Sequence, residues 1–260
     1  MPKQGEIDYI KNIPAEAVQQ ALGKPFSYEM CGRYLMDIGA ILSLLPDWPP
    51  ARILDLGVGT GWTSIFIAKR GFDVVGQDIA ADMIALANEN KARWGIDNVD
   101  FVVSDYEAMT FDHEFDAAVF YDSLHHAVDE RLALAKVYQA LKPGGKVITV
   151  EPGEGHSQSP ESIEAMRRWG VTEKDMPPHH IMSIGREIGF HNFKVYARYH
   201  VPQLIYDGSL PPPPPARIRR VTHNLRAAYA ALVGPTPPPT PPDPAPPLAL
   251  RASNILTMLK

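Results

Sequence analysis

Three glycines stand close together in the segment ILDLGVGTGWTS, which joins an apolar run to a second, partly apolar one. They are Gly57, Gly59 and Gly61, and Asp55 lies two residues before the first of them. Glycine adopts positive φ angles readily, and because it lacks a Cβ it lets a ligand lie against backbone N–H groups. A tight turn without a ligand also uses glycine, but the place of these residues between a predicted strand and a predicted helix favours a binding loop.

Carboxylates follow the next two apolar runs. Asp78 ends VVGQD, 21 residues after Gly57, a spacing at which a carboxylate accepts hydrogen bonds from both hydroxyls of a ribose. The alternative is that Asp78 caps a helix that begins near Ala81. Asp105 and Tyr106 in VVSDYEAM are placed to contact an adenine amino group and the side of the base. Three strand ends then meet at one crevice, where open α/β sheets bind ligands, and a nucleoside cofactor is predicted.

Short apolar runs alternate with helical patterns along most of the chain, as in an α/β protein with a mostly parallel sheet. Strands are predicted at 52–56, 73–77, 99–103, 117–121, 146–150, 193–198 and 253–259. Helices are predicted at 28–45, 62–70, 81–94, 130–141 and 179–188. The predicted fold is α/β, with a Rossmann-like, doubly wound, seven-stranded sheet.

The composition is that of a folded protein without a strong charge bias. Of the 260 residues, 45% are hydrophobic and 21% are charged, which is typical of globular domains. The net charge of −5 gives no general attraction to nucleic acid or anionic lipid, so neither is predicted as a partner. A single cysteine, Cys31, excludes an intramolecular disulfide, and the first residues lack the apolar core of a signal peptide. With no run long enough for a membrane helix, a cytoplasmic protein is expected.

Proline marks a separate segment near the end of the chain, because 15 of the 26 prolines lie in residues 201–260. Between two proline-rich stretches, 216–233 has apolar residues at helical spacing together with four arginines, which predicts a short amphipathic helix. The arginines either form a solvated face or bind an acidic partner. The predicted domains are an N-terminal helical cap at 1–50, a core at 51–200, a proline-rich insertion with this helix at 201–250, and a last core strand at 251–260.

Together these motifs resemble those of class I S-adenosylmethionine-dependent methyltransferases. The resemblance rests on LDLGVGTG, on Asp78 and Asp105 at their strand ends, on FDAAVFYDSLHH and on LKPGGKV. It covers about 28–198 and resumes at ASNILTMLK, which is similar to the family's final antiparallel strand. A dinucleotide dehydrogenase fits less well, because its usual loop is GxGxxG, whereas this loop is GxGxG.

The resemblance implies S-adenosylmethionine as the cofactor. Asp55 and the three glycines would hold its methionine portion, and Asp78 would hold the ribose. Ile79, Asp105 and Tyr106 would contact the adenine. The family's final strand also implies that the sheet ends in an antiparallel strand.

The helix predicted at 28–45 carries three further candidates. Tyr28 and Arg33 lie where such enzymes contact the cofactor, and the planar guanidinium of Arg33 suits a carboxylate. Tyr34 lies where they cover the acceptor. The alternative is a surface arginine beside packed tyrosines, and spacing within the helix does not decide between the two.

Methyl transfer is an in-line displacement, so the protein mainly aligns the acceptor with the methyl group. A hydroxyl or ammonium acceptor must also lose a proton, which a histidine with a pKa of about 6.5 can take. His125 and His126 in YDSLHHAVDE are the candidate bases, His125 first, and the alternative is that they only close the pocket. Tyr121 and Asp122, at the end of the fourth strand, would lie beside the transferring methyl group and orient the acceptor.

The segment after the fifth predicted strand would form part of the acceptor pocket. Glu151 and His156 are candidate acceptor contacts, or a second base. A divalent metal held by some of Asp122, Glu151, His156 and the histidine pairs is not predicted, because no HxH or HExxH spacing supports it.

The sequence therefore predicts a methyltransferase that acts on a small or medium-sized acceptor, with the hydroxyl of a sugar or glycan precursor as the first candidate. One alternative is N- or O-methylation of a secondary metabolite. Another, of a different class, is a catalytically silent protein that uses the cofactor fold and the proline-rich segment for interaction. The chain lacks the Asn/Asp-Pro-Pro-Tyr turn of enzymes that methylate amino groups of DNA bases. A homodimer is left open.

Overall fold

The computed structural model describes residues 3–47, 49–198 and 248–260. The chain divides into two units, one formed by residues 1–200 and 246–260 and the other by residues 201–245. The predicted helix at 216–233 lies outside the described residues, as does the predicted proline-rich insertion apart from its last three residues. Every helix and strand of the described residues belongs to the first unit.

Seven strands of the described residues form one sheet. They are β1 (Arg52–Leu56), β2 (Asp73–Asp78), β3 (Val99–Val103), β4 (Phe115–Tyr121), β5 (Leu141–Val150), β6 (His191–Tyr196) and β7 (Ile255–Leu259). Their order in the sheet is β3-β2-β1-β4-β5-β7-β6. Strands β1 to β5 pair in parallel, whereas β7 is antiparallel to both β5 and β6. The predicted doubly wound sheet with an antiparallel last strand is confirmed, and its switch point lies between β1 and β4.

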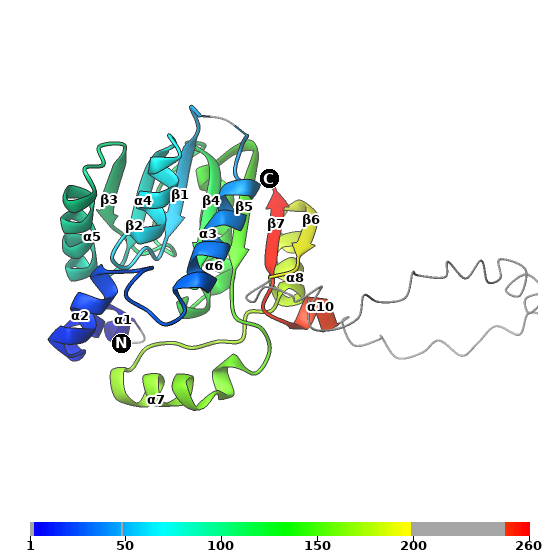
Figure 1. Cartoon of the computed structure of the whole chain (residues 1–260). Helices are drawn as coiled ribbons and strands as arrows, with labels where there is room; N and C mark the ends of the chain where they lie inside the picture. Colours follow the sequence, from blue (N-terminus) through cyan, green and yellow to red (C-terminus); the bar gives the residue numbers. More distant parts are fainter. Residues whose placement is uncertain (1–2, 48, 199–247) are drawn as a thin grey trace, which may run out of the picture. The chain divides into compact units, whose positions relative to one another are not determined.

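Helices cover both faces of this sheet (Figure 1). On one face lie α3 (Cys31–Leu44), α4 (Trp62–Lys69) and α5 (Ala81–Trp94), and on the other lie α6 (Glu130–Ala140) and α8 (Pro178–Ile188). Three more helices lie at the end of the sheet where the parallel strands finish, namely α1 (Gln4–Asn12), α2 (Ala15–Leu22) and α7 (Pro160–Trp169). The short α10 (Leu248–Arg251) leads into β7, and two 3-10 turns are η1 (Leu124–His126) and η2 (His156–Gln158).

Residues that are typical of helix ends occupy the ends of α6 and α7. Asp129 caps α6 by accepting a hydrogen bond from the Leu132 N–H. Ser159 caps α7 in the same way, Pro160 occupies its first turn, and Gly170 ends it in the left-handed conformation with φ +67°. The Ser-Pro pair and the glycine were therefore available as signals for α7, which the apolar pattern alone does not predict.

The largest difference from the predicted elements is at β5. The prediction starts this strand at residue 146, but α6 passes directly into β5 at Leu141. The register with β4 shifts between Phe115 and Ala117, which accommodates the Pro-Gly-Gly sequence within the strand. The helices α1 and α2 were predicted only as part of a helical cap, without bounds.

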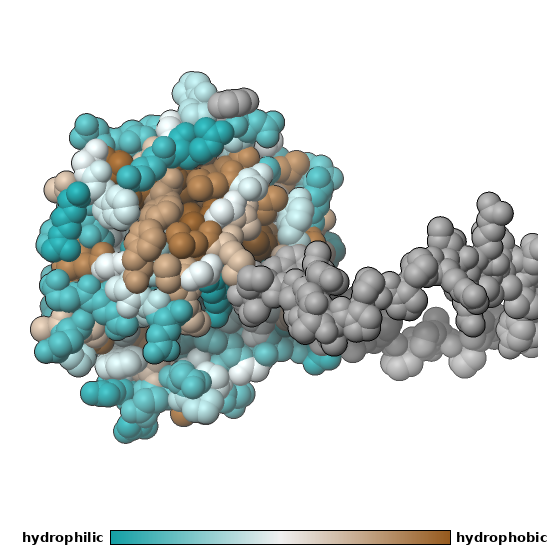
Figure 2. Space-filling view, in the orientation of Figure 1, coloured by the Kyte–Doolittle hydropathy of each residue, from teal (hydrophilic) through white to brown (hydrophobic). Residues whose placement is uncertain are grey.

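Two apolar clusters hold the layers together, one on each face of the sheet. The first joins β4 and β5 to α6 and α8, with Phe115, Phe120 and Leu134 fully buried. The second joins β1 and β2 to α3 and α4, with Ile41 and Ile67 fully buried. Figure 2 shows further apolar side chains on the surface over α3, where Leu35 and Met36 are exposed.

Among the described residues, no helix is both long enough and apolar enough to cross a bilayer.

Candidate functional site

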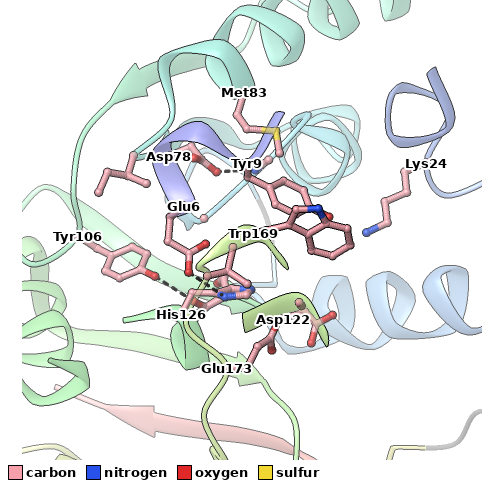
Figure 3. Close-up of a pocket in the computed structure, with 16 residues that line it drawn as sticks. Glu6, Tyr9, Lys24, Asp78, Met83, Tyr106, Asp122, His126, Trp169 and Glu173 are labelled. Atoms are coloured by element: carbon pink, nitrogen blue, oxygen red, sulfur yellow. Dashed lines mark hydrogen bonds and ion pairs between the residues drawn. The ribbon is translucent and has the colours of Figure 1, made fainter. Parts of the chain in front are cut away.

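A cavity of about 350 Å³ lies where the carboxyl ends of the parallel strands meet α1 and α7 (Figure 3). Its volume is at the lower end of the range of about 300–1,000 Å³ for small-molecule sites. The strand ends and the loops that follow them contribute Gly57, Gly59, Asp78, Ile79, Met83, Tyr106, Asp122, Ser123 and His126. The surrounding helices and loops contribute Glu6, Tyr9, Lys24, Ala165, Trp169, Val171 and Glu173. Seven of the predicted site residues thus line one cavity.

The glycine loop joins β1 to α4, and each of its three glycines has a positive φ angle. A Cβ at Gly57 would lie 2.5 Å from the Ser123 Cβ, and one at Gly61 would lie 2.5 Å from the Phe101 ring. A Cβ at Gly59 would meet no other atom within 4 Å. Gly57 and Gly61 therefore serve close packing, whereas Gly59 keeps the wall of the cavity open.

Two predicted carboxylates hold this loop. Asp55 is buried and accepts hydrogen bonds from the Thr63 and Ser64 hydroxyls, both at 2.6 Å. Burial raises its pKa to about 6, although both hydroxyls oppose the shift. Asp55 does not line the cavity, and its predicted contact with the methionine portion of a cofactor stays a prediction.

Asp78 lines the cavity at the end of β2. Its carboxylate accepts hydrogen bonds from the Gly59 N–H at 2.8 Å and from the Ala80 N–H at 2.9 Å. Burial raises its pKa, against the effect of these two N–H groups. The N-cap of α5 is Ala80, and no side chain makes a capping hydrogen bond there. Asp78 is therefore not the N-cap of this helix. Ile79 lies beside it in the wall.

The two candidates after β3 are separated by the structure. Tyr106 lines the cavity and donates a hydrogen bond from its hydroxyl to the Ser123 carbonyl at 3.0 Å. Asp105 does not line the cavity, because its carboxylate pairs with Lys3, which also contacts Glu107 at 2.9 Å. The predicted contact between Asp105 and an adenine stays a prediction.

His125 is buried and does not line the cavity. Its Nδ1 donates to Glu151 Oε2 at 2.8 Å, and its Nε2 lies 3.4 Å from Glu173 Oε2. Burial lowers the pKa of this imidazole, but the two carboxylates outweigh burial and raise it to about 10. At this pKa His125 is protonated at neutral pH, which does not favour a proton-accepting role. Its role as the first candidate base stays a prediction.

Glu151, at the end of β5, is the partner that fixes this histidine. Its Oε1 accepts from the Ser123 and Leu124 N–H groups at 3.1 and 2.9 Å, and its Oε2 accepts from the His125 N–H at 3.3 Å. The side chain is 1% exposed, and both oxygens are used within the protein. Glu151 thus holds η1 and His125 in place, and a direct contact with an acceptor is not expected.

His126 and Glu173 face the cavity beside His125. The His126 Nδ1 donates to the Thr172 carbonyl at 2.6 Å, because a carbonyl oxygen only accepts. Glu173 lies 2.7 Å from the His156 Nε2. Burial raises the pKa of Glu173, but His125 and the neighbouring histidines outweigh it and lower the pKa to about 2. His156 contacts Glu173, but His156 itself does not line the cavity.

Asp122 follows β4 with a φ angle of +54°, and its carboxylate opens into the cavity (Figure 3). Burial raises the pKa of Asp122, but the positive charges of His125, Arg198 and Lys24 outweigh burial and lower this pKa. Lys24 reaches the cavity from the loop after α2, and burial lowers the pKa of its ammonium. An anion and a cation thus face the same space.

The tyrosines predicted on the first helix lie behind Lys24. Its ammonium stands 5.2 Å from the Tyr28 ring and 4.9 Å from the Tyr34 ring, and the two rings meet edge to face. These are cation–π contacts. Neither tyrosine lines the cavity, so both position Lys24 at its edge.

Tyr121 and Arg33 lie around a buried ion pair outside the cavity. The Tyr121 hydroxyl donates to Asp37 at 2.9 Å, and burial raises the pKa of Tyr121. Arg198 binds both oxygens of Asp37, at 2.9 and 2.6 Å, with both side chains 2% exposed. Arg33 lies 3.9 Å from the same carboxylate. The cofactor contacts predicted for Tyr121 and Arg33 stay predictions.

Residues 53–145 match a family model described as a methyltransferase domain. The chain is 36% identical over 134 residues to a demethylmenaquinone methyltransferase of Thermus thermophilus, covering 48% of this chain and 60% of the relative. It is 34% identical over 105 residues to the ubiquinone/menaquinone biosynthesis C-methyltransferase UbiE of Pectobacterium atrosepticum, covering 38% of this chain and 42% of the relative. The chain thus spans less than two thirds of either relative.

A solved structure with the same fold is phosphoethanolamine N-methyltransferase 2 of Haemonchus contortus, in complex with phosphomonomethylethanolamine and S-adenosylhomocysteine. Its TM-score is 0.54 at 28% identity, over 62% of this chain and 38% of that one. Residues 53–145 are a methyltransferase domain. The S-adenosylmethionine-dependent family predicted from the sequence is confirmed.

Several residues that line the cavity were not predicted from the sequence. Glu6 and Tyr9 come from α1, and Trp169 from the end of α7. Tyr9 and Trp169 meet edge to face at 5.5 Å, and Glu6 accepts a hydrogen bond from the Thr172 N–H at 2.7 Å. Together α1 and α7 cover the cavity, with the backbone of Gly5 so close to Gly170 that a Cβ at Gly5 would lie 2.0 Å from its carbonyl oxygen.

Proposed function

We propose that the chain is an S-adenosylmethionine-dependent methyltransferase that acts on a small acceptor within this cavity. The observation that carries the proposal is the meeting of Gly57, Gly59, Asp78 and Ile79 at the switch point of a methyltransferase fold, in the wall of one cavity. Open α/β sheets bind their ligands at this place. The adenosine portion would lie against Ile79 and Tyr106, and Asp78 would accept hydrogen bonds from the ribose.

The acceptor would occupy the other side of the cavity. Lys24, Asp122, His126 and Trp169 face this space. An ammonium and a carboxylate can bind the hydroxyls of one acceptor from opposite sides, and the indole supplies an apolar wall. This lining supports the hydroxyl of a small polar acceptor, such as a sugar or glycan precursor, as the first class to test.

The chemistry needs alignment and a proton acceptor. A lone pair of the acceptor oxygen attacks the methyl carbon, the carbon–sulfur bond breaks, and its electron pair remains on sulfur as S-adenosylhomocysteine forms. The acceptor's proton passes to a base. Because His125 is protonated and lies outside the cavity, Asp122 and His126 are the candidates that remain within reach of an acceptor.

The names of the relatives favour two other acceptor classes, which the same site must be tested against. They are a demethylated quinone, whose methyl acceptor is carbon, and phosphoethanolamine, whose acceptor is nitrogen. The cavity of about 350 Å³ favours the smaller acceptors unless α1 and α7 move apart. The alternative that the acceptor is a secondary metabolite is tested in the same way, by incubation with candidate acceptors.

The first experiment is a calorimetric titration of the full chain with S-adenosylmethionine and S-adenosylhomocysteine. Asp78→Ala removes both hydrogen bonds to the ribose and should weaken binding by at least about 100-fold, because each hydrogen bond to a charged group contributes roughly 1.5–3 kcal/mol. Asp100→Ala is the matched control, because Asp100 lies on β3 with its side chain 81% exposed. Unchanged affinity in Asp78→Ala would contradict the proposed cofactor site.

The second experiment separates the acceptor classes and the silent alternative. The chain is incubated with S-adenosylmethionine and, in turn, sugar nucleotides, a demethylated quinone and phosphoethanolamine, and products are sought by mass spectrometry. A methylated sugar would support the proposed acceptor class. A methylated quinone or amine would contradict it and identify the acceptor class instead. Failure to bind either cofactor form would favour the catalytically silent interaction protein.

A further inference from the structure

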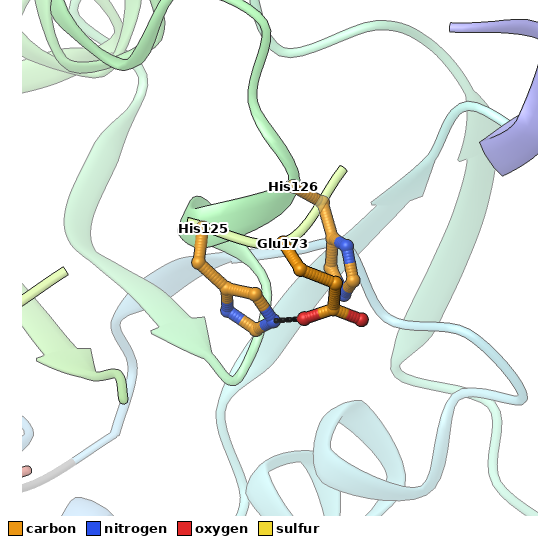
Figure 4. A group of neighbouring side chains, drawn as sticks. All are labelled: His125, His126 and Glu173. Carbon is orange, nitrogen blue, oxygen red and sulfur yellow. Dashed lines mark ion pairs between the residues drawn. The ribbon is translucent and has the colours of Figure 1, made fainter. Parts of the chain in front are cut away.

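His125, His126 and Glu173 converge on one point at the edge of the cavity (Figure 4). Each offers one ligand atom, and the three atoms lie within 4.8 Å of one another. The residues come from η1 and from the loop after α7, so the fold and not a sequence motif brings them together. Two imidazoles and one carboxylate are a donor set that binds Zn²⁺ and similar divalent ions.

The far sides of both rings are fixed in the way that metal-binding histidines require. His125 Nδ1 donates to Glu151 at 2.8 Å, and His126 Nδ1 donates to the Thr172 carbonyl at 2.6 Å. Histidines that bind metal through Nε2 usually donate Nδ1–H to a carboxylate or a backbone carbonyl, which sets the tautomer and orients the ring. Nε2 is therefore the nitrogen of each ring that remains to face a ligand.

The carboxylate is also oriented. Glu173 is held by the His156 Nε2 at 2.7 Å, which leaves it beside the two rings. His125 Nε2 lies 3.4 Å from Glu173 Oε2, which is long for an N–H···O hydrogen bond of about 2.7–3.2 Å. It is the separation of two ligands on a tetrahedral ion with bonds of about 2.1 Å, which is about 3.4 Å.

The surroundings favour positive charge at this point. Glu151 and Glu173 contact the rings, and Glu6 lies 3.4 Å from the His126 Nδ1. A divalent ion would supply positive charge among these carboxylates.

We infer that His125, His126 and Glu173 form a site for a divalent metal ion of the Zn²⁺ type. Three protein ligands leave a fourth position, as in catalytic zinc sites, and because His126 and Glu173 line the cavity this position faces it. The ion's role in catalysis rests on the proposed function. There it would bind the acceptor oxygen and lower its pKa, so that the proton passes to Asp122 before the oxygen attacks the methyl carbon.

This role names the acceptor as a hydroxyl compound whose oxygen can bind a metal.

The test is metal binding by the full chain after treatment with a chelator that is then removed. Zn²⁺ is titrated by calorimetry, and Co²⁺ is added separately because its visible absorption reports a four- or five-coordinate nitrogen and oxygen site. We expect one ion per chain. Glu173→Gln and His126→Gln should each weaken Zn²⁺ binding at least tenfold, whereas His191→Gln, an exposed histidine on β6, should not change it.

Absence of Zn²⁺ uptake by the unmodified chain would overturn the inference. So would equal affinity in the unmodified chain and in both Glu173→Gln and His126→Gln, because the ion would then lie elsewhere. Titration of the unmodified chain with S-adenosylmethionine, with and without Zn²⁺, distinguishes the two proposals. Cofactor binding without Zn²⁺ uptake rejects only the metal site, and Zn²⁺ uptake without cofactor binding rejects only the proposed function.

Discussion

Raising the pH should remove a defined part of the stability of this protein through His125. The pKa of this buried imidazole is about 10 in the folded chain and 6.5 in a free side chain. Because the folded value is the higher one, the stabilisation is complete below pH 6.5 and is lost as the pH rises toward 10. The difference of 3.5 units, at 1.36 kcal/mol per unit, corresponds to about 5 kcal/mol.

The measurement is the free energy of unfolding in urea at intervals from pH 6 to 10, with a chelator present so that no metal contributes. The comparison is His125→Asn, whose amide nitrogen takes the place of Nδ1 and can still donate to Glu151 but does not titrate. Between pH 6.5 and 10, the unmodified chain should lose up to about 1.4 kcal/mol per pH unit more than the variant. Parallel curves for the two proteins would refute the raised pKa, and with it the argument that His125 is not the base.

Two further substitutions test the packing that shapes the site. Gly61→Ala places a Cβ 2.5 Å from the Phe101 ring at a φ angle of +78°, and should cost about 2–4 kcal/mol in urea unfolding. Gly95→Ala, also at positive φ but in open space, should cost only about 1 kcal/mol, and similar losses for both would reject the packing argument. Arg198→Met leaves a buried carboxylate of α3 without its bidentate partner and should cost about 3–5 kcal/mol in thermal or urea unfolding. Arg167→Met, which breaks an exposed ion pair on α7, should cost less than about 1 kcal/mol, and an equal effect of the two would refute the burial argument.

The strand ends were predictable because local rules determine them. A glycine loop after an apolar run, and a carboxylate at the end of the next run, need only the period of a strand and the parallel order of the sheet. Gly57, Gly59, Asp78 and Ile79 therefore stand in the cavity wall as expected. The α/β fold was predicted for the same reason. The antiparallel last strand was implied by the family resemblance.

The cover of the cavity was not predictable in this way. Glu6, Tyr9 and Trp169 reach the site only because α1 packs against α7, and these helices are more than 140 residues apart in the sequence. No local pattern marks such a contact. The close approach of Gly5 to Gly170 is visible only once both backbones are placed.

The protonation of His125 illustrates a second limit. Its residue type suggested a base, but its pKa is set by Glu151 and Glu173, which lie 26 and 48 residues further along the chain. A histidine between two carboxylates holds its proton. The sequence places the histidine pair after β4 but does not show these partners.

The arrangement of the last two strands affects how the chain is made. Among the described strands, β6 pairs only with β7, which is inserted between β6 and β5. A ribosome makes β6 well before it makes Ile255–Leu259, so β6 has no partner and the edge of β5 stays open until the final strand emerges. An open edge of this kind is prone to pair with other chains. We therefore expect the nascent chain to depend on chaperones until Ile255–Leu259 emerge from the ribosome, and any truncation that removes β7 to leave β6 outside the sheet.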